Sequence, residues 1–288
     1  MAATDTATTA ITRPRPVPSG RFSFLAPLAA GYGNRWLVVR MSRREIEARF
    51  KGSLLGILWS ILTPLLMLGV YTFVFSVVMK ARWGGGGESR GSFALQLFSG
   101  LIVFNIFAEA INRSPTLLIE NVSYIKKIVF PLDALAWVVL LSSLFNAAVS
   151  LLIWLVFYGV SVGVPPWTAV LFPLTLLPLC LLTLGLTWFL SSLGVFLRDA
   201  RHMVAIFTQM LMFVSPVFFP KSAVPMRFQA VMNLNPLTLV LEQAKGVLLL
   251  GQLPDWKAWL ALTAASWVVC MLGHAWFQRT RKAFADVI

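Results

Sequence analysis

One short stretch of the sequence gathers side chains that could take part in chemistry. Residues 198–220, RDARHMVAIFTQMLMFVSPVFFP, begin with a cluster of charged or titratable groups. The members of this cluster are Arg198, Asp199, Arg201 and His202. Such side chains can transfer protons, bind an anion or a metal ion, or hold a partner protein by charge. Residues 203–219 contain no Asp, Glu, Lys or Arg, so the polar chemistry is confined to one edge of a long apolar segment.

The rest of the sequence does not supply partners for catalysis. It contains no recognisable Ser/His/Asp set, carboxylate pair or metal-ligand spacing. Cys180 and Cys270 each lie in an apolar run, which is typical of small buried side chains rather than of disulfides or metal ligands. The glycine run at residues 84–87 lacks the Lys and Ser/Thr of a phosphate-binding loop and is expected to be a hairpin tip. We therefore expect no catalytic, cofactor-binding or metal-binding residues.

The elements that position these residues are expected to be membrane-spanning helices. The 288 residues are 58% hydrophobic and 12% charged, and the mean hydropathy is +0.79, whereas a soluble domain has about 25% charged residues. The net charge of +13 does not indicate nucleic-acid binding, because the basic residues lie between apolar runs. We expect one membrane domain at residues 31–288. Residues 1–30, rich in Thr, Ala and Pro and without a signal-peptide pattern, are expected to be a disordered cytoplasmic tail.

The apolar runs predict an all-α integral membrane protein with six transmembrane helices. About 20 residues are needed for one crossing. The expected spans are residues 54–79, 93–111, 134–158, 167–189, 202–219 and 256–277. Pro64 predicts a kink in the first span. Residues 220–255 are interrupted by Pro, Asn and charged residues, so we expect short re-entrant or interfacial helices between spans five and six.

The distribution of Lys and Arg predicts the orientation in the membrane. If the N-terminus is cytoplasmic, the cytoplasmic segments hold 17 of the 24 basic residues, as the positive-inside rule requires. Both termini and the cluster at 198–202 are therefore expected at the inner face. Residues 35–50 are expected to form an N-terminal interfacial helix whose basic face contacts anionic membrane lipid.

A second cytoplasmic helix is predicted at residues 115–129, PTLLIENVSYIKKIV. Apolar residues recur on one face at spacings of four, three and four, and polar residues recur in the same way on the other. The apolar positions are Leu118, Val122, Ile125 and Val129, and the polar positions are Thr116, Glu120, Ser123 and Lys127. Pro115 suits the first turn, and Pro131 ends the helix. The pattern leaves two interpretations open: a helix resting on lipid headgroups, or a helix that contacts protein.

The apolar spans also limit how transport could be driven. Ion-coupled carriers usually place ionisable residues at mid-membrane. Spans one, three, four and six have no Asp, Glu, Lys or Arg in their interiors, and Glu109, His202 and His274 lie near span ends. Any energy for transport is therefore expected to come from another chain.

Four stretches of the sequence resemble the permease subunits of ABC polysaccharide exporters, with O-antigen permeases nearest. They are RFKGSLLGILWSILTPLLMLGVYTFVFSVV (49–78), IENVSYIKKIVFPLDAL (119–135), LRDARHMVAIFTQMLMFVSPVFFP (197–220) and LNPLTLVLEQAKGVLL (234–249). The resemblance implies a homodimer in the bacterial inner membrane, joined to two copies of an ATPase subunit that binds ATP and Mg. This chain would then be a transporter subunit and no enzyme, exporting a lipid-linked polysaccharide. Export of capsule, teichoic acid or a small molecule is the alternative, and a non-transporting membrane enzyme or scaffold is the third interpretation.

The resemblance also implies roles for particular residues. The helix at 115–129 is similar to the coupling helix that docks on the ATPase. The implied ATPase contacts are Glu120, Ser123, Tyr124, Lys127, Arg198, Asp199 and Arg201. The implied outer-gate residues are Pro220, Pro225, Asn235 and Pro236. Spans one and five would line the channel, where aromatic rings could hold passing sugars weakly, although such rings also pack against lipid or neighbouring helices. The candidates are Trp59, Tyr71, Phe75, Phe207 and Phe213.

Overall fold

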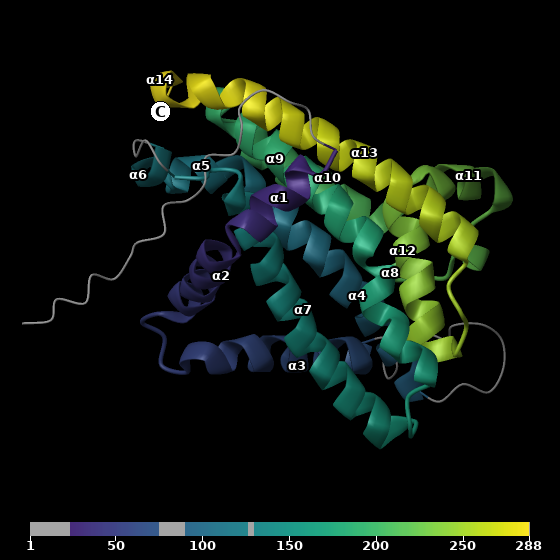
Figure 1. Cartoon of the computed structure of the whole chain (residues 1–288). Helices are drawn as coiled ribbons and strands as arrows, with labels where there is room; N and C mark the ends of the chain where they lie inside the picture. Colours follow the sequence, from purple (N-terminus) through teal and green to yellow (C-terminus); the bar gives the residue numbers. More distant parts are fainter. Residues whose placement is uncertain (1–23, 75–89, 126–129, 288) are drawn as a thin grey trace, which may run out of the picture.

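A computed structural model describes residues 24–74, 90–125 and 130–287 (Figure 1). Over these ranges the secondary structure is helical, without a β-strand, which confirms the all-α prediction. The chain begins with α1 (Ala26–Gly33) and α2 (Arg35–Phe50), followed by η1 (Gly56–Leu58) and α3 (Trp59–Tyr71). The bounds of α2 are those expected for the interfacial helix. Helix α1 begins within the stretch assigned to the tail.

The remaining helices alternate between long and short elements. The long ones are α4 (Arg90–Arg113), α7 (Ala134–Ser161), α9 (Leu177–Phe196), α10 (Ala200–Val214) and α13 (Trp256–Thr280). The short ones are η3 (Ser114–Thr116), α5 (Leu117–Glu120), α6 (Val122–Ile125), η4 (Trp167–Leu171), α8 (Phe172–Thr175), η5 (Lys221–Ala223), α11 (Met226–Leu234), α12 (Pro236–Lys245), the π-helix η6 (Gly246–Leu250), η7 (Arg281–Ala283) and α14 (Phe284–Val287). In Figure 1, α5, α6 and α14 gather at one end of the bundle, and α11 and α12 lie toward the other.

Among the described residues, five helical stretches are long and apolar enough to cross a membrane. They are Gly56–Val74, Phe93–Glu120, Ala134–Ser161, Trp167–Phe196 and Trp256–Ala283. Each coincides with one of the expected spans, so the chain is a multi-pass membrane protein. The fourth stretch continues past the expected end at residue 189, because α9 runs on to Phe196.

The helix found at the expected fifth span, residues 202–219, is shorter than predicted. Helix α10 has 15 residues, which corresponds to about 22 Å, whereas the hydrocarbon core is about 30 Å thick. The helix ends at Val214 because Pro216 has no amide hydrogen and disfavours a helical conformation for the residue before it. Ser215 is accordingly extended, with φ −88° and ψ 149°.

Helix α4 is the centre of the packed core. In the most apolar part of the span that contains α4, 83% of the residues are buried, whereas 6% are buried in the corresponding part of the span that contains α3. Helices α7, α9, α10 and α12 all contact α4. A buried tryptophan stabilises the contact between α7 and α4, because the Trp154 indole N–H donates a hydrogen bond to the Leu95 carbonyl oxygen at 3.0 Å. Helix α3, by contrast, leaves most of its apolar surface uncovered by the described chain.

Glycines bring α9 into backbone contact with two neighbours. A Cβ added to Gly273 of α13 would lie 2.0 Å from the carbonyl oxygen of Gly185 in α9. A Cβ added to Gly194 would lie 2.0 Å from the carbonyl oxygen of Pro115 in η3. Real Cβ atoms do not come this close, so only glycine allows either contact. Helix α9 therefore joins α13 to the segment that continues into α5.

Replacing Gly194 with Ala should destabilise the protein. Overpacking of this kind costs about 1–3 kcal/mol. The matched control is Gly159→Ala on α7, where an added Cβ meets no atom within 4 Å and the loss of glycine favours the helix by about 0.5–1 kcal/mol. We expect the detergent-solubilised protein to unfold at a lower temperature with Gly194→Ala and at an unchanged or higher temperature with Gly159→Ala. Equal unfolding temperatures for the two variants would contradict the contact between α9 and η3.

Candidate functional site

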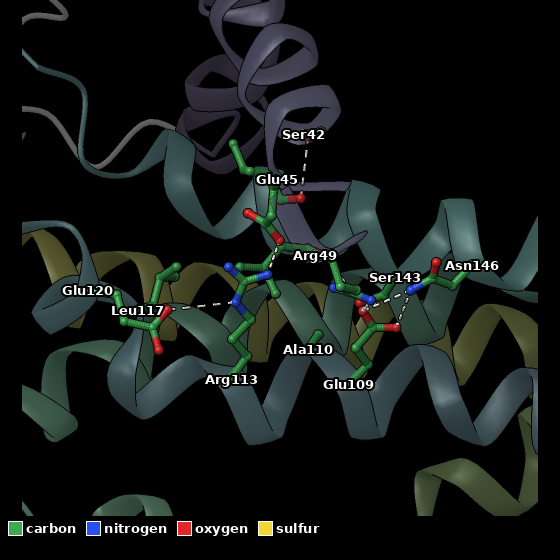
Figure 2. Close-up of polar contacts among 12 residues, drawn as sticks. Ser42, Glu45, Arg49, Glu109, Ala110, Arg113, Leu117, Glu120, Ser143 and Asn146 are labelled. Atoms are coloured by element: carbon green, nitrogen blue, oxygen red, sulfur yellow. Dashed lines mark hydrogen bonds and ion pairs between the residues drawn. The ribbon is translucent and has the colours of Figure 1, made fainter. Parts of the chain in front are cut away.

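Two helices bring opposite charges together near the C-terminal end of α4. Glu45 and Arg49 lie one turn apart on α2, and Glu109 and Arg113 lie one turn apart on α4. Arg113 pairs with Glu45, and Arg49 pairs with Glu109. Figure 2 shows both pairs between the two helices, and we refer to these four residues as the charge clamp. Because acid precedes base on both helices, the complementary charges fit only when the helices run in opposite directions.

The charge clamp is largely withdrawn from solvent. The side chains of Arg113 and Glu45 are 28% and 14% exposed, and those of Arg49 and Glu109 are 33% and 25% exposed. Removing one partner from such a pair leaves a poorly solvated charge, which is strongly destabilising. Asn146 of α7 adds to the cluster, because its Nδ2 lies 3.0 Å and 2.9 Å from the two carboxylate oxygens of Glu109 (Figure 2). The clamp thus connects α2, α4 and α7.

The same helices extend the polar contacts to α5 and α6. Arg113 Nε lies 4.0 Å from a carboxylate oxygen of Glu120. Arg44 of α2 donates a hydrogen bond of 2.6 Å to the Tyr124 hydroxyl, and its guanidinium lies 5.8 Å from the centre of that ring. Helix α2 therefore contacts α6 through Arg44, and α4 contacts α5 through Arg113. A cleft of about 450 Å³ lies between these elements and is lined by Met41, Arg44, Glu45, Ala48, Arg49, Arg113, Leu117, Glu120, Asn121 and Leu135.

The amphipathic helix predicted at residues 115–129 is divided into short pieces. Asn121 separates α5 from α6 with φ −115° and ψ 28°, and its Nδ2 donates to the Leu117 carbonyl oxygen at 2.8 Å. Asparagine favours such interruptions because its side chain competes for backbone hydrogen bonds. Leu118 is buried, as its place on the apolar face predicts, while Glu120 is exposed.

The other residues of the implied ATPase contact lie as follows. Ser123 is exposed on α6, whereas the Tyr124 ring stacks on Phe130 at 4.4 Å. Lys127 lies outside the described residues. Arg198, Asp199 and Arg201 are all exposed at the start of α10. Because α10 packs against η3, the structure brings both parts of the implied contact to one end of the bundle.

Among the described residues, the implied channel-lining rings lie on α3 and α10. Trp59 and Tyr71 lie at opposite ends of α3, and Phe75 lies outside the described residues. Phe207 and Phe213 of α10 are 61% and 59% exposed. Helix α3 packs on α7 and α4, and α10 packs on α4, α9 and η3. Both helices therefore lie against α4.

The implied outer-gate residues stand at helix starts. Pro220 and Pro225 precede η5 and α11, and Pro236 is the first residue of α12. Asn235 caps α12, because its Oδ1 accepts from the Leu237 amide at 3.0 Å, and its Nδ2 donates to the Ser215 hydroxyl at 2.9 Å. These contacts join α12 to the turn that ends α10.

Three further polar contacts were not foreseen from the sequence. The buried Lys245 ammonium donates to the Pro216 carbonyl oxygen at 2.6 Å, which provides a second link between α12 and the end of α10. His274 Nε2 of α13 lies 3.8 Å from an Asp133 carboxylate oxygen. Trp188 of α9 donates to the Asp133 carbonyl oxygen at 3.0 Å. Asp133, directly before α7, is therefore bonded to both α9 and α13.

The sequence contains a spacing pattern that matches the charge clamp. Residues 45 and 49 are acid and base four positions apart, and so are residues 109 and 113. This matched spacing is what two antiparallel helices need to form paired ion pairs. The pattern does not say that the two segments meet, because the sequence alone does not place the interfacial helix against the second span.

Reversing the charge of Glu45 should destabilise the protein. Glu45→Arg places two guanidinium groups together, and we expect the free energy of unfolding to fall by about 1–3 kcal/mol. The matched control is Glu47→Arg on the same helix, because the Arg43–Glu47 pair is exposed by 82% and 59% and such pairs contribute less than about 1 kcal/mol. Adding Arg113→Glu to Glu45→Arg should recover part of the stability. If the two single variants unfold at the same temperature in detergent, the clamp does not stabilise the fold.

Known proteins are similar in sequence to this chain over most of its length. The family model described as ABC-2 type transporter matches residues 37–249. An O-antigen export system permease protein of Myxococcus xanthus is 30% identical over 260 residues, which cover 89% of this chain and 97% of the relative. One from Klebsiella pneumoniae is 25% identical over 255 residues, covering 88% and 95%. A polysialic acid transport protein of Escherichia coli is 27% identical over 245 residues, covering 83% and 92%.

The range matched by the family model holds most of the elements described above, while α1, α13 and α14 lie outside it. It begins within α2 and ends within η6, so it includes the charge clamp, α5, α6, α10 and α12. The resemblance inferred from the four sequence stretches is confirmed. The chain belongs to the ABC-2 type transporter family.

Proposed function

We propose that the chain is the membrane-spanning subunit of an ATP-driven exporter that moves a lipid-linked, O-antigen-like polysaccharide out of the cytoplasm. The observation that carries the proposal is the nearly end-to-end similarity to O-antigen export system permease proteins of two organisms. A second candidate cargo is a capsule-type polysaccharide, because a polysialic acid transport protein is also similar over most of the chain.

The energy for export comes, in this proposal, from a separate ATPase subunit present in two copies, which also binds ATP and Mg. The ATPase would dock where α5, α6 and the start of α10 lie together. Glu120, Ser123, Arg198, Asp199 and Arg201 supply an exposed polar surface there. A displacement of α5 or α6 would act on α2 through Arg44 and on α4 through Arg113. The geometry supports this role because these contacts connect the docking surface to the buried core.

Two copies of the chain would form the channel. Helices α3 and α10 both leave large apolar side chains uncovered, including Trp59, Phe207 and Phe213. If the two faces meet their counterparts across a twofold axis, aromatic rings from both chains border one passage. The turn after α10, together with α11 and α12, would then close its outer end. With α10 counted as a crossing, each copy spans the bacterial inner membrane six times with both termini in the cytoplasm.

The orientation can be tested by labelling single cysteines in intact cells. Cys180 and Cys270 are first replaced by Ala, so that the introduced thiol is the one detected. A cysteine at position 86 should react with a membrane-impermeant maleimide from outside, because it lies in the loop expected to be external. A cysteine at position 123, exposed on α6, should react only after the cells are opened. The reverse pattern would overturn the orientation.

The coupling role and the function can be tested together by charge reversal. Glu120→Lys and Arg201→Glu should each weaken copurification of the ATPase subunit by about tenfold, because like charges in a contact cost 1 kcal/mol or more. Surface glycan, measured by lectin or antibody binding at equal protein level, should fall with it. Arg227→Glu is the matched control for copurification of the ATPase subunit, since this residue is exposed on α11, which lies away from α5 and α6. Normal glycan display in cells that lack this chain would refute the proposed function.

A further inference from the structure

The last helices of the chain hold the segment that lies between α6 and α7 in the sequence. Arg281 of η7 donates a hydrogen bond of 3.0 Å to the Phe130 carbonyl oxygen. Gln278 Nε2 lies 3.3 Å from a carboxylate oxygen of Asp133, and His274 Nε2 lies 3.8 Å from the same oxygen. We refer to His274, Gln278 and Arg281 as the C-terminal brace. Their spacings of four and three place them on one face of a helix, so a single helical surface reaches residues 130–133.

Asp133 supports this contact instead of its own helix. It stands directly before α7, where an aspartate usually accepts hydrogen bonds from the first amides of the helix. The Asp133 side chain makes no such bond. Its carboxylate faces α13 instead, and the side chains of Asp133 and His274 are both 9% exposed. The Trp188 ring packs edge-on against His274, with 4.8 Å between the ring centres, so the pair is enclosed between α9 and α13.

Phe130 links the C-terminal brace to α6. Its ring stacks on the Tyr124 ring, with 4.4 Å between the ring centres. The Tyr124 hydroxyl accepts a hydrogen bond from Arg44 of α2. Helix α6 is thus held to α2 through Arg44 and to the end of α13 through Phe130 and Arg281. A displacement of α6 would act on both helices.

The helix end that carries the C-terminal brace is itself anchored. Phe284 of α14 is buried, and its ring packs on Phe277 at 5.4 Å and on Phe196 at 6.2 Å. The hydroxyls of Thr280 and Ser192 lie 2.7 Å apart and join α13 to α9. Helix α13 lies outside the range matched by the family model, so a role for its last turns does not follow from family membership.

We propose that the C-terminal brace positions residues 130–133 so that movement of α6 is passed to α13, which makes His274, Gln278 and Arg281 positioning residues for ATP-driven export. The proposal rests on the proposed function, because it takes a partner ATPase as the source of that movement. The three residues are separate from the exposed surface assigned to ATPase docking. Loss of the brace should therefore leave docking intact and uncouple ATP hydrolysis from export.

The contact can be tested without ATPase or cargo, by hydrogen–deuterium exchange of the full-length chain in detergent. Arg281→Met removes the donor to Phe130, and amides in residues 117–125 and 132–136 should exchange about fivefold faster, as loss of one hydrogen bond implies. Arg281→Lys keeps a donor and should give an intermediate rate. Lys282→Met, which changes an exposed neighbouring cation, is the matched control and should exchange like the wild type. Equal exchange in Arg281→Met and Lys282→Met would refute the brace.

The coupling role can be tested with the complete transporter in cells at equal protein level. In Arg281→Met, copurification and ATP hydrolysis of the ATPase subunit should stay within about twofold of wild type, while surface glycan falls about tenfold. Arg281→Lys should recover part of the glycan. Gln278→Leu, which removes the donor to Asp133, should act in the same direction and replaces Arg281→Met if that variant does not accumulate. A merely structural role would lower the amount of folded chain without changing glycan per folded chain.

Two results would overturn the coupling role. The first is wild-type glycan per folded chain in both Arg281→Met and Gln278→Leu. The second is a parallel loss of copurification and glycan, which would make the C-terminal brace a determinant of docking instead. Failure of the proposed function would be recognised separately, as normal glycan in cells that lack the whole chain, and it would leave the exchange result unchanged.

Discussion

The cost of placing charge among apolar helices decides where α2 lies. Glu109 lies near the end of the apolar stretch Phe93–Glu120, and a partly buried carboxylate without a partner there would be costly. Arg49 and Asn146 satisfy it, and Glu45 satisfies Arg113 one turn further along. These partners are within reach because α2 packs on α7 beside the C-terminal end of α4. Helix α2 is thereby fixed to the core at one end of the molecule, although among its described side chains only Val38, Met41 and Ser42 are buried.

The backbone contacts of α9 limit how much of any motion at that end could be absorbed locally. Side chains can change rotamer when a neighbour moves, but the contact between Gly194 and Pro115 has no side chain to adjust. A shift of η3 therefore moves α9, and α9 moves α13 through the second glycine contact at Gly185. Asp133 joins the start of α7 to the same two helices. The segment formed by η3 and α5 is consequently connected to three long helices by short, stiff links.

The sequence predicted the elements better than their contacts. Apolar runs and the basic residues around α2 carry local information, and the bounds of α2 and the positions of five spans followed from it, although most of these spans end later than expected. Two differences between the predicted and the described helices also have local causes. Pro216 ends α10, and Asn121 divides the helix predicted at residues 115–129. The charge clamp and the Asp133–His274 pair could not be predicted, because each joins segments far apart in the chain. Residue type showed that these groups need partners, but packing alone determines which partners they meet.

The two ends of α10 are fixed in different ways, and this difference bears on how the helix could work. Its first residues are exposed and lie beside η3. The turn that follows it is held to α12 by the hydrogen bonds of Asn235 to Ser215 and of Lys245 to Pro216. Between the two ends, the large side chains Met203, Phe207 and Met210 are not covered by the described chain. A force applied at Arg198 or Arg201 would therefore pass along a short helix to α12, with the face that carries Phe207 uncovered.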